Sequence, residues 1–329
     1  MRRPPPLSSI ISFPATGGIA LFAVATSIAV FMGKDISQLD MTIMAFRGEP
    51  WRLMTSALPH GGIFHLLFNV YWLWVFGSYI EKEFGTLTLL GMFVVFSSGS
   101  MGAEYAFLNG GIGLSGVGYG LFGFLWQLGR HDIRYRDAMD KQTSYLFIGW
   151  FFLCIVLTAL DVWRIANVAH GYGLLLGALW GRSVAHKDIP RRAGFAAGMV
   201  VLTVLAVLGA ALWRPAINVS PTAGQDSAYL GYRAIEEDDY RTGAELYAEA
   251  IKMNDDKPGW WRNYAICLLK TGQGDAALKA FVRELTLDPD SPSLDMLRAM
   301  ERGDDETQII DSPTGQPADN NNGLPTQEP

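Results

Sequence analysis

Two polar residues that could act together stand near the starts of separate apolar runs. Ser115 lies in Gly-Leu-Ser-Gly at the beginning of run 114–128, and His170 lies in Ala-His-Gly-Tyr-Gly near the beginning of run 167–184. A serine hydroxyl attacks a carbonyl carbon well only when a base takes its proton, and ionisable groups at membrane depth are costly and usually functional. We therefore predict a nucleophile–base pair of Ser115 and His170. The alternative is that His170 only caps or bridges helices.

Two hydrogen-bond donors precede this pair in the chain. His65 and Asn69 are four residues apart, which places both on one face of a helix. Acyl transfer needs donors aimed at the oxyanion of the tetrahedral intermediate. We expect His65, Asn69 and the backbone N–H of Ser115 to supply them, and we expect His60 to lie at the water boundary, where it binds water or nothing.

The imidazole of His170 also needs a partner that fixes its orientation. Tyr119 follows Ser115 by one helical turn and is expected to stack beneath the ring of His170. No buried carboxylate is expected for this task, since Asp161 falls at the end of its run. Close packing of the two helices is predicted from small residues four apart, namely Gly116 and Gly120 on one run and Gly173 and Gly177 on the other.

The composition indicates a membrane protein with a soluble part. Half of the 329 residues are hydrophobic and only 18% are charged, with a positive mean hydropathy. From residue 221 onward the chain holds 21 acidic and 10 basic residues, so the acidic charge belongs to the C-terminal part. The two cysteines allow no disulfide framework. Metal-ligand clusters and phosphate-binding glycine loops are not evident, and no cofactor, metal or nucleic-acid partner is expected.

Seven apolar runs predict a polytopic helix bundle, because most approach the roughly 20 residues needed to cross a bilayer. They cover residues 17–33, 63–80, 87–108, 114–128, 145–160, 167–184 and 193–213. The fourth run is short, which suits a start below the surface in a water-filled recess. The alternative interpretation of the first run is a signal peptide, but the length of the run favours an uncleaved span.

The distribution of Lys and Arg predicts the orientation. Eleven of these residues fall on the side of the N-terminus and four on the other before the last span, which places the N-terminus in the cytoplasm. Spans two, four and six then run inward. His65, Ser115 and His170 are therefore expected near the outer ends of their spans, in a site open to the extracytoplasmic face.

The connection 34–62 is long for a structureless loop. We expect it to form short amphipathic helices in the membrane interface. Arg52, next to Trp51, could pair with Glu81 and hold the connection against the second span. The two charges could equally be unrelated.

The C-terminal part contains an internal repeat. Positions 240, 247 and 250 recur 34 residues later at 274, 281 and 284, and the second copy follows the tetratricopeptide offsets at Trp261, Tyr264, Ala265, Leu268, Gly272, Ala277, Phe281 and Pro289. Small residues at 265 and 277 would let two helices approach, and residues 291–302 would form an extra helix that caps the last pair. The repeats could bind a partner or serve as a stabilising appendage.

The combined motifs resemble the rhomboid intramembrane serine proteases over roughly residues 51–180. They are Trp51-Arg52, His65-xxx-Asn69, Gly113-Leu-Ser115-Gly116 with Tyr119, and Ala169-His170-xx-Gly173-xxx-Gly177. The resemblance implies a Ser115–His170 dyad, an oxyanion hole from His65, Asn69 and the Ser115 amide, and six core helices around a cavity open outward. A seventh span and an outward tetratricopeptide tail are similar to those of some family members. Tyr172 departs from the smaller residues usual there and could narrow the cavity.

We therefore predict an all-α membrane protein with a small helical soluble domain. Its parts are a basic tail (1–16), a six-span core (17–192), a seventh span (193–213), a linker (214–227), extracytoplasmic repeats (228–302) and a disordered acidic tail (303–329). The expected function is cleavage of single-span membrane proteins in a bacterial plasma membrane, with repeats for a partner or substrate. The alternatives are a non-proteolytic scaffold and a transporter, and the clustering of polar groups at one depth disfavours a transporter.

Overall fold

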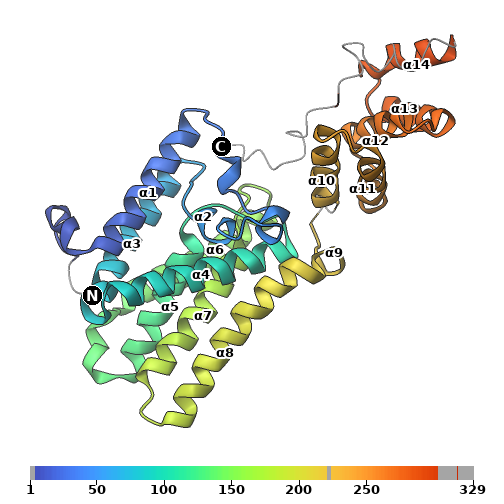
Figure 1. The fold of residues 1–329 in the computed structure, drawn as a ribbon. Coiled ribbons are helices and arrows are strands. Elements are labelled where there is room, and N and C mark those ends of the chain that lie inside the picture. The colour runs from blue at the N-terminus through green and yellow to red at the C-terminus, as the bar shows by residue number, and fades with distance from the viewer. Residues whose placement is uncertain (1–3, 221–223, 303–316, 318–329) are drawn as a thin grey trace. The chain divides into compact units, whose positions relative to one another are not determined.

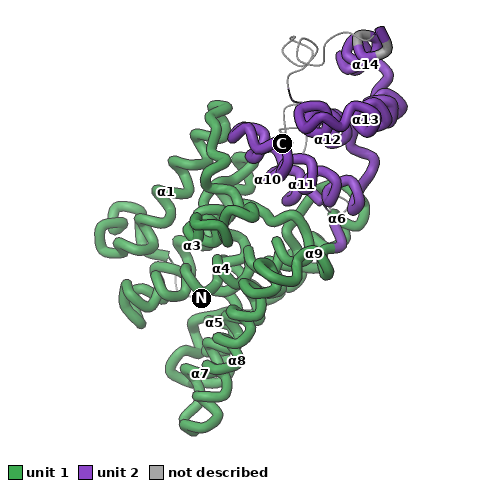
Figure 2. The backbone as a smooth tube through the Cα atoms, turned by 45° about the vertical axis from the view of Figure 1, so that its right-hand side comes forward, with its two compact units in different colours: residues 1–218, 329 green, residues 219–328 purple. Residues whose placement is uncertain are grey.

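A computed structural model describes residues 4–220, 224–302 and 317. Within these ranges every regular element is a helix, which confirms the predicted all-α fold. The chain divides into two compact units, one ending at Asn218 and the other starting at Val219 (Figure 2). The predicted acidic tail, apart from residue 317, and the arginines at positions 2 and 3 lie outside the described residues.

The first unit is a bundle of long helices, shown in Figure 1. Their bounds are α1 Pro14–Phe31, α3 Ile63–Phe84, α4 Thr86–Phe107, α5 Ser115–His131, α6 Lys141–Ala159, α7 Asn167–Ala185 and α8 Ile189–Leu208. A π-helical turn, η5 Gly209–Trp213, and the short helix α9 Arg214–Ile217 continue α8 without a break. Residues 214–217, expected in the linker, are therefore helical and belong to the first unit.

Five of the described helices are long and apolar enough to cross a membrane, as expected of an integral membrane protein. They are α1, α3, α4, α6 and the continuous helix Ile189–Ile217. The helices that carry Ser115 and His170, α5 and α7, are outside this group. Helix α5 has only 17 residues, and ten of them are buried. It therefore lies inside the bundle, covered by its neighbours.

Helices α5 and α7 pack backbone against backbone. A Cβ atom added to Gly173, Gly177 or Gly181 would overlap the carbonyl oxygen of residue 116, 120 or 124, respectively. The offset between the facing positions is constant, so the two helices run parallel. The predicted packing through residues 116, 120, 173 and 177 is thus present, and it places the starts of α5 and α7 at the same end of the bundle.

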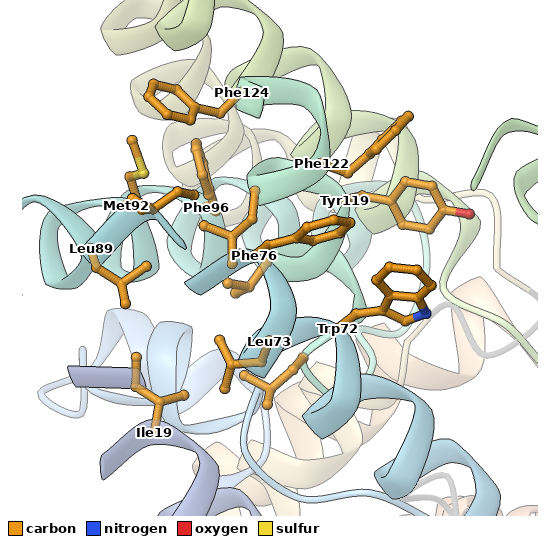
Figure 3. Close-up of a cluster of buried hydrophobic side chains, with 14 of the residues drawn as sticks. Ile19, Trp72, Leu73, Phe76, Leu89, Met92, Phe96, Tyr119, Phe122 and Phe124 are labelled. Carbon is orange, nitrogen blue, oxygen red and sulfur yellow. The ribbon is translucent and has the colours of Figure 1, made fainter. Parts of the chain in front are cut away.

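Aromatic side chains fill the space on the other side of α5 (Figure 3). Phe122 stacks on Phe147 of α6, with ring centroids 4.6 Å apart, and Phe147 also contacts Trp72 and Phe76 of α3. Phe96 of α4 lies directly over Gly120, where a Cβ atom would collide with its ring. Helix α5 is therefore fixed from three directions.

The connection between α1 and α3 contains two 3-10 turns, η2 Ser37–Leu39 and η3 Ile43–Phe46, and the short helix α2 Arg52–Thr55. The buried Arg52 pairs with Glu49 at 2.5 Å and donates to the Ser37 and Asp40 carbonyls. Trp51, just before it, is exposed. Arg52 thus holds together separate parts of this connection through contacts within it.

The predicted pairing of Arg52 with Glu81 is wrong. Glu81 lies in the last turn of α3, whereas the connection enters α3 at its first turn, and a helix of this length spans about 30 Å. The Glu81 carboxylate instead accepts hydrogen bonds from the Ala15 and Thr16 backbone N–H groups at 2.9 and 2.8 Å, and from the Thr16 hydroxyl. It therefore caps the N-terminus of α1.

The end of the last span is clamped to the end of α4. Arg214 stacks on the Tyr105 ring at 3.7 Å and donates to the carbonyls of Tyr105 and Leu108. Asn218 donates to the same Leu108 carbonyl at 2.6 Å. These bonds satisfy carbonyls that the end of a helix leaves open.

The described residues of the second unit form five helices, α10 Gln225–Glu236, α11 Tyr240–Met253, α12 Pro258–Lys270, α13 Gly274–Leu287 and α14 Ser293–Glu301. The repeat-related residues Tyr247 and Phe281 are fully buried, as are Ala265 and Ala277, the small residues predicted at the helix contacts. Asn263 donates to the Tyr247 hydroxyl at 2.8 Å. The unit therefore has a hydrophobic core of its own.

Candidate active site

Ser115 is the first residue of α5, and the backbone before it is held in place. Gly113 has φ +102°, a conformation that other residues rarely adopt, and a Cβ atom there would lie 2.8 Å from His65 Cε1. The Gly113 N–H donates to the Ser56 carbonyl at 3.2 Å. Ser115 is half-buried, and its own N–H belongs to the first turn, where helix N–H groups have no partner within the helix.

The expectation that His60 lies at the water boundary is wrong, because its side chain is fully buried. Its Nε2 accepts from the Leu114 N–H at 3.2 Å, and its Nδ1 lies 3.2 Å from the Ser27 hydroxyl. The Leu114 bond requires the proton on Nδ1, so Nδ1 donates to Ser27, which donates to the Ala23 carbonyl. His60 therefore links the serine loop, residues 108–114 before Ser115, to α1.

His170 meets Ser115 directly. Its Nε2 lies 2.8 Å from Ser115 Oγ, and the histidine side chain is 4% exposed. When Nε2 accepts the hydroxyl proton, Nδ1 carries the ring proton, and Nδ1 has no hydrogen-bond partner among the described residues. The orientation of the ring therefore depends on packing and on the position of its backbone.

Tyr119 provides that packing. Its ring centroid lies 4.7 Å from that of His170 at an interplanar angle of 31°. The Tyr119 hydroxyl donates to the Phe147 carbonyl of α6 at 3.1 Å. The tyrosine thus contacts the histidine with its face and α6 with its hydroxyl.

The two side chains predicted to donate to the oxyanion, His65 and Asn69, differ in their exposure and in their contacts. His65 lies beside Gly113, has an exposed side chain, and packs edge-on against His60 with centroids 4.8 Å apart. Asn69 is buried, and its amide donates to the His65 carbonyl one turn back at 2.9 Å. The Asn69 NH2 group has two hydrogens, so it can keep this bond and offer the second hydrogen to an oxyanion.

Tyr172 is held by the last span. Its hydroxyl donates to the Leu202 carbonyl of α8 at 2.6 Å. The predicted narrowing of the cavity by Tyr172 finds no support in this contact, which ties α7 to α8.

A buried acid near His170 was not predicted from the sequence. Glu104, in the last turns of α4, is 2% exposed, and its Oε2 accepts from the Ala169 N–H at 2.8 Å. The expectation that no buried carboxylate serves His170 was therefore wrong in part, because Glu104 binds the backbone beside His170 and does not bind the ring. A single acid within the apolar run 87–108 was the signal that could have revealed it.

Outside the spanning helices, burial shifts the pKa of a carboxyl group in the connection before α3. Burial raises the pKa of Asp40 to about 6, and the nearby Arg52 guanidinium opposes this rise. The group is therefore protonated in mildly acidic solution, where an ordinary aspartate is ionised.

Comparison with known proteins adds independent evidence. Residues 47–187 match the Rhomboid domain, and residues 234–301 match a Tetratricopeptide repeat. Rhomboid protease GlpG of Pectobacterium atrosepticum is 33% identical over 174 residues, and that of Yersinia pseudotuberculosis is 31% identical over 178 residues. Rhomboid protease GlpG of Haemophilus influenzae is 29% identical over 181 residues.

Each match covers half of this chain. The aligned part spans 61% of the length of the Pectobacterium and Yersinia proteins and 90% of the Haemophilus protein. Residues 47–187, which match the Rhomboid domain, include Ser115, His170, His65 and Asn69. The first unit therefore contains a Rhomboid domain, and the second contains a tetratricopeptide-repeat region.

Proposed function

We propose that this protein is an intramembrane serine endopeptidase that cleaves transmembrane segments of single-span membrane proteins near the extracytoplasmic face. The observation that carries the proposal is the 2.8 Å contact between His170 Nε2 and Ser115 Oγ at the start of α5. The relatives named rhomboid protease support the same class of activity.

In this mechanism His170 takes the Ser115 proton as Oγ attacks the scissile carbonyl carbon. The negative charge develops on the carbonyl oxygen, where the Ser115 N–H, His65 and Asn69 are the available donors. The N-terminal end of α5 adds a favourable dipole. His170 then returns the proton to the leaving amine, and a water molecule hydrolyses the acyl-enzyme through the same base.

The substrate must present an extended peptide to this site, because the attacking oxygen stands at a helix end enclosed by other helices. A helical substrate must unwind locally, so residues that weaken helices should mark the cleaved segment. The charge distribution supports a cytoplasmic N-terminus, and seven spans would place the repeats on the extracytoplasmic side. The bacterial relatives support a bacterial plasma membrane. The repeats are proposed to bind a partner or the substrate itself.

The test is labelling of the detergent-solubilised full chain with a fluorophosphonate, which reacts with activated serines. We expect the parent to be labelled and Ser115→Ala and His170→Ala to be unlabelled. Ser78→Ala is the matched control, because Ser78 is a buried serine that donates to the Trp74 carbonyl of its own helix, and it should be labelled like the parent. Absence of labelling in folded parent would overturn the proposal and favour a non-proteolytic scaffold that acts through the repeats.

A further inference from the structure

We propose that Glu104 is a positioning residue for His170, acting by capping the N-terminus of α7 from the neighbouring helix α4. This inference rests on the proposed function, since it assigns Glu104 to the same site. Glu104 does not contact the imidazole. Its effect on the reaction is to fix the backbone from which the imidazole projects.

The carboxylate meets the first turn of α7 one residue before the base. Glu104 Oε2 accepts from the Ala169 N–H at 2.8 Å. The next residue is His170, whose own N–H donates to the Ala166 carbonyl at 3.1 Å. Glu104 therefore binds the amide directly before that of the base.

Helix α7 has no cap of its own at this end. The N-cap residue is Ala166, which has no side-chain acceptor for the first-turn N–H groups. Buried N–H groups without partners are strongly unfavourable, and a negative charge at a helix N-terminus is favoured by the helix dipole. A buried glutamate is equally unfavourable without donors. Each group therefore satisfies the other.

This cap lies at the end of α7 that precedes its closest backbone contacts with α5. The glycine contacts with α5 begin at Gly173 and continue toward the other end of the helix. His170 is one turn before the first of them, and its Nδ1 atom has no partner among the described residues. The position of the imidazole thus depends on the first turn of α7, together with the Tyr119 ring and the contact with Ser115 Oγ.

The same point also borders the chain that leads to the nucleophile. A Cβ atom on Gly111, which lies between α4 and Ser115, would approach Ala166 to 2.9 Å and Glu104 Cγ to 3.9 Å. Glu104 therefore stands where the serine loop and the histidine helix come together. Loss of the carboxylate should move the base relative to the hydroxyl, and a misplacement of about 1 Å can cost about 100-fold in rate.

The protein contains a matched control for this arrangement. Glu81 caps α1 as Glu104 caps α7, with bonds to the Ala15 and Thr16 N–H groups. It lies 16 residues beyond His65 on the same helix, which corresponds to about 24 Å. Glu81 therefore tests a buried helix cap that is remote from the dyad.

The experiment compares Glu104→Ala, Glu104→Gln, Glu81→Ala and Glu81→Gln in the full chain. For each variant, the maximal rate of fluorophosphonate labelling and the half-saturating reagent concentration are measured on the folded fraction, together with the unfolding temperature. We expect Glu104→Ala to lower the maximal rate by about 100-fold with little change in the half-saturating concentration. Glu104→Gln keeps an acceptor oxygen and should recover most of the rate. Both Glu81 variants should unfold at lower temperature and label like the parent.

Hydrogen exchange of the amides of residues 168–170 gives a second measurement that needs no activity. It should accelerate in Glu104→Ala and in neither Glu81 variant. If the parent is unlabelled, the proposed protease function fails and the exchange result alone decides whether Glu104 holds α7. Parent-like labelling of folded Glu104→Ala, or unchanged exchange, would overturn the assignment. Glu104→Gln as slow as Glu104→Ala would also contradict it.

Discussion

Helices α5 and α6 both adjoin the histidine helix, but they are held in different ways. Helix α5 meets α7 through glycines and backbone carbonyls, and ten of its 17 residues are buried. Helix α6 has three buried residues among 19, and its described contacts with α3 and α5 are largely aromatic, such as Phe147 with Phe122 and Trp150 with Phe68. A backbone contact cannot adjust, whereas a side-chain contact can change rotamer.

This difference distinguishes the two helices that carry Ser115 and His170 from the neighbouring helix α6. Ser115 and His170 are carried by the rigid pair, so the reacting atoms keep their distance when side chains elsewhere move. Helix α6 is held by rings that can rearrange without disturbing α5 and α7. Substitutions in the two contacts should therefore have different consequences.

The largest effect is expected in the glycine contact. Gly177→Ala places a methyl group on the Gly120 carbonyl, and overpacking of this kind typically costs about 1–3 kcal/mol. The unfolding free energy and the labelling of Ser115 should both fall. Gly149 of α6 has open space at its Cβ position, so Gly149→Ala should be neutral or stabilise by up to about 1 kcal/mol. Equal losses in the two variants would refute the comparison.

Tyr119 contacts both His170 of α7 and the backbone of α6, so two substitutions of this residue can separate the two effects. Tyr119→Ala removes the ring against His170 and should slow labelling by up to about 100-fold. Tyr119→Phe keeps the ring and loses only the hydrogen bond to the Phe147 carbonyl of α6, worth about 1 kcal/mol. Its labelling rate should stay near that of the parent. A Tyr119→Phe variant as slow as Tyr119→Ala would show that α6 positions the base.

A smaller effect is expected from the aromatic contact between α3 and α6. Trp150→Ala removes the contact with Phe68, where the ring centroids are 5.5 Å apart. Such a pair contributes about 0.5–1.5 kcal/mol beyond the area it buries. Labelling by a small fluorophosphonate should be unchanged, because this pair joins α6 to α3 and neither helix carries Ser115 or His170. A change in labelling would contradict the independence of the dyad.

The smallest effect is expected outside both contacts. The pKa of Asp40 is raised to about 6, so the folded protein binds a proton there that the unfolded chain has lost. Its contribution to stability is present in acid and is lost as the pH rises from about 4 to about 6. Asp40→Asn should flatten this part of the curve of unfolding temperature against pH. A parent curve that rises over this range and is unchanged in the variant would refute it.

Several features of the fold and site were predictable from local pattern. The apolar runs around Ser115 and His170 matched real helices, and glycines four apart at 116, 120, 173 and 177 marked the contact between them. The repeat offsets placed Tyr247 and Phe281 at equivalent buried positions. Period and spacing carry this information because they set which face of a helix is buried.

The remaining features depended on contacts between distant segments. The burial of His60 follows from its bonds to Ser27 and Leu114, and no local pattern in the sequence specifies either. Arg52 was assigned a partner by charge alone, although Glu81 lies at the opposite end of α3. Glu104 was overlooked because it sits inside an apolar run, and its role follows only from the approach of α7.

The spacing of the glycines has a further consequence for assembly. Both helices repeat their contact every four residues, so the next arrangement that seats glycines against carbonyls is a slide of four residues, or about 6 Å. Intermediate positions would drive α7 against the carbonyls of α5, and a full step would carry the imidazole out of reach of the hydroxyl. Only one register of α7 against α5 therefore brings His170 to Ser115, and no intermediate register packs well.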